Sequence, residues 1–178
     1  MAAIIIQDAC LLINLLSSGR FEEMAGGCGL RFAITRAAAR EALFLHDPVS
    51  GERERIELQP LIEEGLLELL AAESENEKER YLELALSLDD GEAESVAIAE
   101  TRNLALATDD KKARNLIRRE GLKIELWSPC SLLRHWQGKC AVPDPETKCV
   151  LANTSNRAKY RPKCGQPDFE WWKKLSSP

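Results

Sequence analysis

The first apolar segment of the chain, Ile4-Ile5-Ile6, constrains the fold most, because it lacks a polar residue at any position. A strand with one solvated face alternates apolar and polar residues, whereas a strand buried on both faces belongs to a parallel sheet covered by helices. Asp8 follows this segment after a single residue. Parallel sheets bind their ligands at the carboxyl edge, so the sequence predicts a functional acid at that edge.

Strand-like and helix-like segments alternate along most of the chain, which predicts an α/β fold with helices on both faces of a mostly parallel sheet. The segment 74–87 is a predicted amphipathic helix whose apolar face holds Tyr81, Leu82, Ala85 and Leu86. A turn at 46–52 is predicted to open a hairpin. The predicted strands are 4–7, 30–34, 66–71, 104–107 and 123–126, and the other predicted helices are 9–16, 21–25, 35–45, 91–101, 111–120 and 128–136.

Carboxylates recur where predicted strands give way to helices. Glu41 lies in the predicted helix 35–45, Glu92 and Glu94 open the helix 91–101, and Asp109 and Asp110 follow the apolar run 104–107. Like charges brought together need a cation, and oxygen-only ligands suit hard ions such as Mg²⁺ or Mn²⁺. The pattern therefore predicts a metal site.

Length and composition set limits on the class of protein. A chain of 178 residues with 44% hydrophobic content fits one domain with an appendage. No apolar segment reaches the roughly 20 residues of a membrane span, and no basic region precedes an apolar stretch near the start. We expect a cytoplasmic protein without a membrane partner.

The six cysteines are too scattered to form a disulfide framework, so reduced thiols are expected. Zinc is an alternative use for some of them together with a histidine. No pair shows the Cys-x-x-Cys spacing typical of such a site, so the sequence disfavours zinc. The residues weighed for it are Cys130, His135, Cys140, Cys149 and Cys164.

The last forty residues differ in charge and pattern from the rest. Residues 139–178 hold eight Lys and Arg against four Asp and Glu, a net +4, which leaves −9 on the remainder of a chain whose total is −5. Prolines and a polar run at 153–156 predict an irregular C-terminal extension, 138–178, attached to a domain 1–137. Its aromatic residues either dock on the domain or contact RNA together with its cations, and docking is favoured. These aromatic residues are Tyr160, Phe169, Trp171 and Trp172.

Four short motifs, in this order and at this spacing, resemble those of PIN-domain nucleases, in particular the bacterial and archaeal VapC-like subgroup with Gly-Glu-Ala-Glu at the third acidic position. The resemblance covers roughly residues 3–136 and implies a three-layer α/β/α sandwich. The motifs are Asp8-Ala9-Cys10-Leu11-Leu12-Ile13-Asn14-Leu15, Thr35 to Glu41, Leu88-Asp89-Asp90-Gly91-Glu92-Ala93-Glu94, and Ala107-Thr108-Asp109-Asp110-Lys111-Lys112-Ala113-Arg114.

Carried over position by position, the resemblance implies catalytic, metal-binding acids at Asp8, Glu41, Glu94 and Asp110. Glu92 and Glu94 point about 200° apart on a helix, and the face through Ala97, Ile98 and Thr101 favours Glu94. The family pattern of threonine, a variable residue and the acid favours Asp110 over Asp109. Glu92 and Asp109 stay open as further metal contacts or as capping acids that complement the dipole at a helix N-terminus. Asn14 and Thr108 are expected to orient carboxylates, although Asn14 can equally be a buried amide with its hydrogen bonds satisfied. Cys10 stands where the family often has a hydroxyl or an amide.

The resemblance implies a Mg²⁺- or Mn²⁺-dependent endoribonuclease, with RNA as its substrate. It also allows the toxin of a toxin–antitoxin pair, with an antitoxin protein as partner, and a homodimer. A non-catalytic PIN-fold module that binds RNA or protein, and a structure-specific DNA nuclease, are the alternatives. Neighbouring cations are expected to hold the phosphodiester backbone, and for Arg36 and Arg40 surface salt bridges are the favoured alternative. They are Arg36, Arg40, Lys111, Lys112 and Arg114.

Overall fold

A central sheet with parallel strand pairing organises the computed structural model, which describes residues 3–6, 9–41 and 43–176. Within these residues the sheet has five strands in the order β5-β2-β1-β6-β7, and every neighbouring pair is parallel. The all-isoleucine segment lies in the middle strand, and its parallel pairing on both sides agrees with the predicted parallel sheet. The strands are β1 (Ala3–Ile6), β2 (Arg31–Thr35), β5 (Leu67–Leu70), β6 (Ala105–Ala107) and β7 (Leu126–Trp127).

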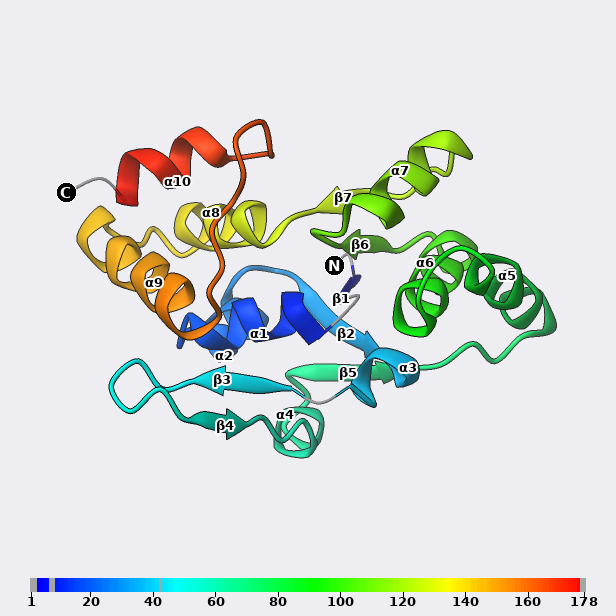
Figure 1. The fold of residues 1–178 in the computed structure, drawn as a ribbon, viewed down its shortest axis with the longest axis horizontal. Helices are drawn as coiled ribbons and strands as arrows, with labels where there is room; N and C mark the ends of the chain where they lie inside the picture. Colours follow the sequence, from blue (N-terminus) through cyan, green and yellow to red (C-terminus); the bar gives the residue numbers. More distant parts are fainter. Residues whose placement is uncertain (1–2, 7–8, 42, 177–178) are drawn as a thin grey trace.

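Helices cover both faces of this sheet. Strand β6 sends Ala105 and Ala107 into one apolar core with α1, α2 and α8, and Leu106 into a second core with α5, α6 and α7. The arrangement is consistent with the predicted three-layer sandwich (Figure 1). The helices outside the C-terminal extension are α1 (Ala9–Ser17), α2 (Phe21–Gly27), α3 (Arg36–Ala39), α4 (Gln59–Glu63), α5 (Glu75–Ala85), α6 (Asp90–Arg102), α7 (Lys111–Arg119) and α8 (Pro129–Lys139).

The predicted helix 35–45 is wrong in its second half. Thr35 caps α3 as expected, because its side chain accepts a hydrogen bond from the Ala38 N–H, but the helix ends at Ala39. The chain then enters β3 (Phe44–His46), which pairs antiparallel with β4 (Arg53–Arg55). The Asp47 carboxylate accepts two backbone N–H groups in the turn between them, and this turn favours the hairpin over a longer helix.

The apolar face predicted for α5 is only half right. Tyr81 and Ala85 pack toward the second core, but Leu82 and Leu86 are 66% and 88% exposed. The buried stripe runs instead through Tyr81, Leu84, Ala85 and Leu88, which follows the i, i+3, i+4, i+7 spacing of a helix more closely.

The C-terminal extension was predicted to be irregular, and this is wrong. It forms α9 (Asp144–Arg157) and α10 (Phe169–Ser176), which lie with α8 at one end of the molecule (Figure 1). The prolines at 143 and 145 suggested loop, yet they occupy the cap and the first turn of α9, where a missing N–H costs little.

Docking of the extension is confirmed. Tyr160 and Trp172 are buried, stack edge to face and join the core that also contains α1 and α8. Trp171 is half-buried, and its indole N–H donates to the Gln137 side chain at 2.8 Å. In the part of the chain that the structure describes, no helix is long and apolar enough to cross a membrane.

Candidate active site

The carboxyl ends of the three middle strands meet at one edge of the sheet. Ile6, the last described residue of β1, pairs with Ile34 of β2 on one side and with Ala107 of β6 on the other. The segments that follow these strands therefore leave from the same edge, where a parallel sheet holds its ligands. Asp8, two positions after Ile6 in the sequence, lies outside the described residues.

Glu94 is held by backbone amides from two other segments of the chain. Its side chain is buried on α6, where one carboxylate oxygen accepts the Ala37 N–H at 2.8 Å and the other accepts the Ala72 N–H at 3.2 Å. These amides follow β2 and β5, so two strand ends fix the carboxylate. Glu94 forms no ion pair with a residue that the structure describes. A buried charge held only by amides favours an external cation.

Glu92 is also buried, although it lies two residues from Glu94 on the same helix. Exposure alone does not separate the two acids. The backbone partners of Glu94, Ala37 and Ala72, lie just after the carboxyl ends of β2 and β5.

Glu41 approaches the first turn of α6, although its own helix is shorter than predicted. A Cβ added to Gly91 would lie 3.0 Å from Glu41 Oε1 and 3.1 Å from the Ala38 Cα. Both distances are tighter than ordinary contacts, so the absence of a side chain at Gly91 lets α3 and the Glu41 carboxylate approach α6. The glycine of the Gly-Glu-Ala-Glu motif thus has a packing role that spacing alone did not reveal.

Asp110 lies on the other side of β1, at the start of α7. Its carboxylate caps this helix by accepting the Ala113 N–H at 2.8 Å, and its own N–H donates to Thr108 Oγ1 at 3.0 Å. Thr108 is buried and holds the main chain of Asp110. Asn14, the other residue predicted to orient a carboxylate, is buried on α1.

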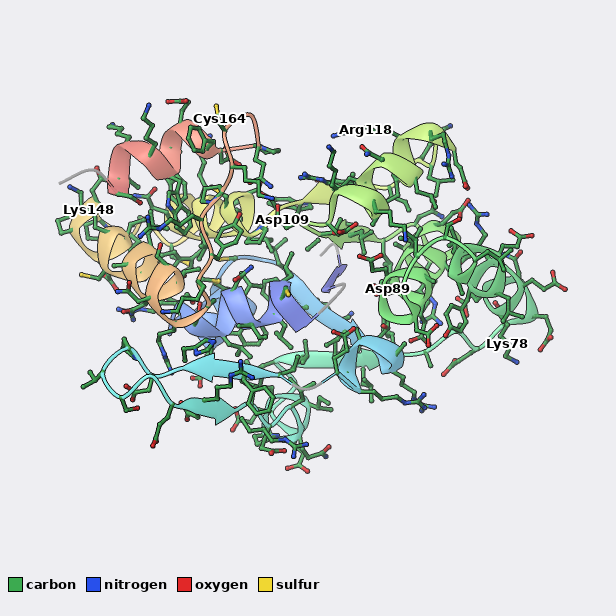
Figure 2. All side chains as sticks on the ribbon, viewed as in Figure 1. Lys78, Asp89, Asp109, Arg118, Lys148 and Cys164 are labelled. Carbon is green, nitrogen blue, oxygen red and sulfur yellow. The ribbon has the colours of Figure 1, made fainter. Side chains whose placement is uncertain are left out.

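Asp109 is engaged by a residue that sequence reasoning missed. Its half-buried carboxylate accepts a hydrogen bond from the Gln166 side-chain amide, which comes from the segment between α9 and α10 (Figure 2 labels Asp109). Burial raises the pKa of Asp109 above its usual value, Asp110 adds to this, and Arg114, Gln166 and Lys163 oppose it. No signal in the sequence links positions 57 residues apart.

The predicted phosphate-binding cations lie mostly at the surface. Four of them are exposed, Arg114 is half-buried, and none forms an ion pair with a described residue. The surface salt bridges considered as an alternative are therefore not present among those residues. The four exposed cations are Arg36, Arg40, Lys111 and Lys112.

Within residues 3–6, 9–41 and 43–176, no three His, Cys, Asp or Glu side chains are grouped closely enough to hold a metal ion together. This finding does not include Asp8. None of the six cysteines, all of which the structure describes, forms a disulfide, and Cys28 Sγ lies 3.7 Å from Cys140 Sγ. The described residues thus offer no zinc site either.

Comparison with known proteins gives one finding. A family model described as PIN domain matches residues 4–125, a range that contains every acid discussed above. Neither curated proteins nor solved structures gave a match.

Proposed function

The chain belongs to the PIN-domain family, and from this premise we propose that it is a metal-dependent endoribonuclease that hydrolyses phosphodiester bonds in RNA. PIN domains are often nucleases and typically use divalent metals. Glu94 supports the proposal most directly, because its buried carboxylate has no cation among the described residues yet lies where β2 and β5 end.

The donor set fits a hard divalent cation, since carboxylate oxygens are the ligands that Mg²⁺ and Mn²⁺ prefer. We assign Asp8, Glu41, Glu94 and Asp110 to this ion, with Glu92 and Asp109 as further contacts. The bound ion would supply a water of lowered pKa and charge stabilisation at the scissile phosphate.

Other groups of the chain orient the proposed metal-binding acids and attract the RNA substrate. Backbone amides keep the Glu94 carboxylate in one orientation, and Thr108 fixes the main chain that presents Asp110. Cations on α3 and α7 offset the net negative charge of the rest of the chain, which would otherwise repel a polyanion. They flank the acids on both sides of β1.

The test is cleavage of single-stranded RNA with Mg²⁺ or Mn²⁺, with and without EDTA, in the native protein and in Asp110→Asn. Asparagine is as good a helix cap as aspartate, so the variant should keep its melting temperature. We expect cleavage to fall by about 100-fold or more, beyond the 10- to 100-fold typical of outer partners of a metal site.

Asp144→Asn is the matched control, because Asp144 also lies at the start of a helix, α9, away from the sheet edge. It should cleave normally. Metal-independent cleavage, or full activity in Asp110→Asn, contradicts the mechanism. A protein that binds Mn²⁺ and cleaves branched DNA but not RNA would be a DNA nuclease. A protein that neither binds Mn²⁺ nor cleaves a nucleic acid would be a non-catalytic module.

A further inference from the structure

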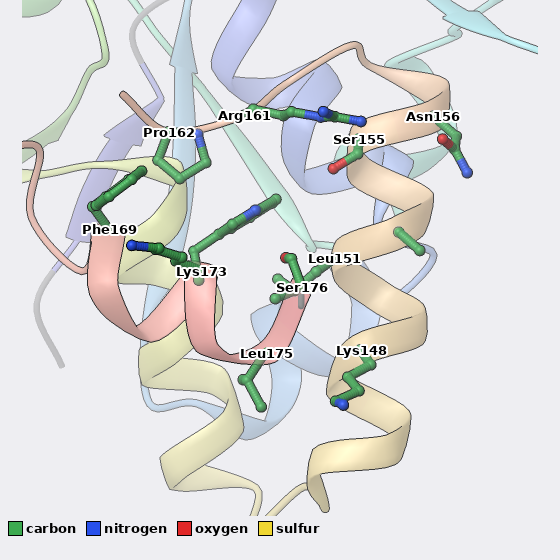
Figure 3. A pocket seen from close by; sticks show the side chains of 12 residues that line it. Lys148, Leu151, Ser155, Asn156, Arg161, Pro162, Phe169, Lys173, Leu175 and Ser176 are labelled. Atoms are coloured by element: carbon green, nitrogen blue, oxygen red, sulfur yellow. The ribbon is translucent and has the colours of Figure 1, made fainter. Parts of the chain in front are cut away.

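A cavity of about 600 Å³ lies in the C-terminal extension, between α9 and α10 (Figure 3). Its floor is apolar, because Leu151 of α9 and Trp172 and Leu175 of α10 are buried there. Phe169, at the start of α10, is half-buried and adds an aromatic ring to the wall. The volume is within the range of small-ligand pockets.

The rim of this cavity is cationic. Lys148, Arg161 and Lys173 line it, and none of its lining residues that the structure describes is acidic. Lys148 and Arg161 are exposed and form no ion pair with a described residue. Ser155 and Asn156 of α9 add hydrogen-bonding groups at the end near Arg161 (Figure 3). An apolar floor, an aromatic wall and a positive rim match a ligand with a flat ring and a negative charge, as in a nucleotide.

The segment that forms one wall of the cavity also reaches the candidate active site. Arg161 lies at the cavity, whereas Gln166, five residues later, donates to Asp109. Lys163 lies between them in the chain and is close enough to Asp109 to lower its pKa. Exposed cations thus continue from the acids to the cavity along one segment.

We propose that the cavity between α9 and α10 binds one nucleotide of the RNA substrate, away from the scissile bond, with its base against Phe169 and its phosphates on Arg161 and Lys173. This inference rests on the proposed ribonuclease function. The extension then acts as a second RNA contact, and RNAs long enough to reach both sites bind more tightly than dinucleotides.

The test measures the Kd of a fluorescent single-stranded RNA by anisotropy in EDTA, so that cleavage does not interfere. The variant Arg161→Glu/Lys173→Glu reverses two charges at the rim. The control Lys139→Glu/Lys174→Glu reverses two exposed charges of the same extension that do not line the cavity. We expect the rim variant to bind about tenfold or more weakly than the control, whose loss reflects net charge alone.

Phe169→Leu tests the ring without a change of charge. Loss of base stacking should weaken binding by about fivefold or more, since stacking on an aromatic side chain is worth at least that. Leucine keeps apolar packing, and an unchanged melting temperature checks the fold. Equal Kd values for the rim variant and its control, or an unchanged Kd in Phe169→Leu, overturn the proposal.

The proposed nuclease mechanism and the proposed nucleotide site can be disproved independently. If Asp110→Asn still cleaves RNA while the rim variant loses binding, the assigned mechanism is wrong and the cavity is a nucleotide site. If Asp110→Asn loses cleavage and both double variants bind equally, the nuclease stands and the cavity is no RNA contact.

Discussion

Two buried glutamates on neighbouring helices have different surroundings, and they differ in whether a described residue supplies a counter-charge. Glu77 of α5 is bound by the Arg102 guanidinium, with Nε 2.6 Å from Oε1, and it also accepts the N–H groups of Glu73 and Ser74. Glu94 of α6 also accepts two backbone N–H groups, but no guanidinium or ammonium group among the described residues pairs with it.

The charge of Glu77 is therefore satisfied within the fold. The pKa of Glu77 is lowered to about 2, and the hydrogen bond from Arg102 is the largest cause. Burial acts in the opposite direction. Glu94 has the hydrogen bonds without the counter-charge. A buried carboxylate that the fold orients but does not neutralise is what a metal site needs, whereas Glu77 needs nothing further.

The most direct test of this difference is to replace each of the two glutamates in turn with neutral glutamine. Glu94→Gln should lose about 100-fold or more of metal-dependent RNA cleavage and most Mn²⁺ binding, because an amide is a poor ligand for a hard ion. Glu77→Gln should cleave within about twofold of the native rate when assayed well below its melting temperature, since it leaves the sheet edge unchanged. Similar activity losses in the two variants would remove the distinction.

The substitution of Glu77 should instead affect the stability of the fold. Glu77→Gln should lower the free energy of unfolding by about 2 kcal/mol at neutral pH, the usual worth of hydrogen bonds between charged groups. Because its pKa is about 2 when folded and near 4.5 otherwise, Glu77 stabilises the native state above pH 4.5, and this contribution is lost as the pH falls from 4.5 toward 2.

Urea unfolding of both proteins between pH 7 and pH 3 measures this effect. The gap between native protein and Glu77→Gln should narrow as the pH falls below 4.5. A gap that is constant with pH would mean that packing, and not the ion pair with Arg102, explains the loss.

Local signals predicted part of the structure around Glu94. The strand order places the all-isoleucine strand in the middle of the sheet, and Thr35 caps its helix as expected. The preference for Glu94 over Glu92 was a geometric argument about one helix face. The structure adds the partners of Glu94, which come from two other elements and are invisible in the sequence.

Long-range contacts explain what sequence reasoning missed. The hydrogen bond from Gln166 to Asp109 and the approach of Gly91 to Ala38 both join segments that no periodic pattern relates. The α9 helix was missed for a local reason, because prolines interrupt a helix interior but suit its first turn. Its buried Thr147, Val150, Leu151 and Thr154 follow helical spacing, a signal that the sequence did contain.

The smallest expected effect concerns the cap that accompanies Glu77. Ser74 Oγ accepts the Glu77 N–H at 3.2 Å, while the Glu77 carboxylate accepts the Ser74 N–H at 3.1 Å, so the two side chains close a reciprocal capping box at the start of α5. Ser74→Ala removes one half of it and should cost about 1 kcal/mol in unfolding free energy without a change in RNA cleavage. Ser74→Asp, which can still cap, is the control and should cost less.

If the box acts as a unit, the double variant Ser74→Ala/Glu77→Gln should lose less stability than the two single losses added together. If the two losses of stability are strictly additive, Glu77 stabilises the fold through Arg102 alone. Its structural role is then the ion pair, for which Glu94 has no counterpart among the described residues.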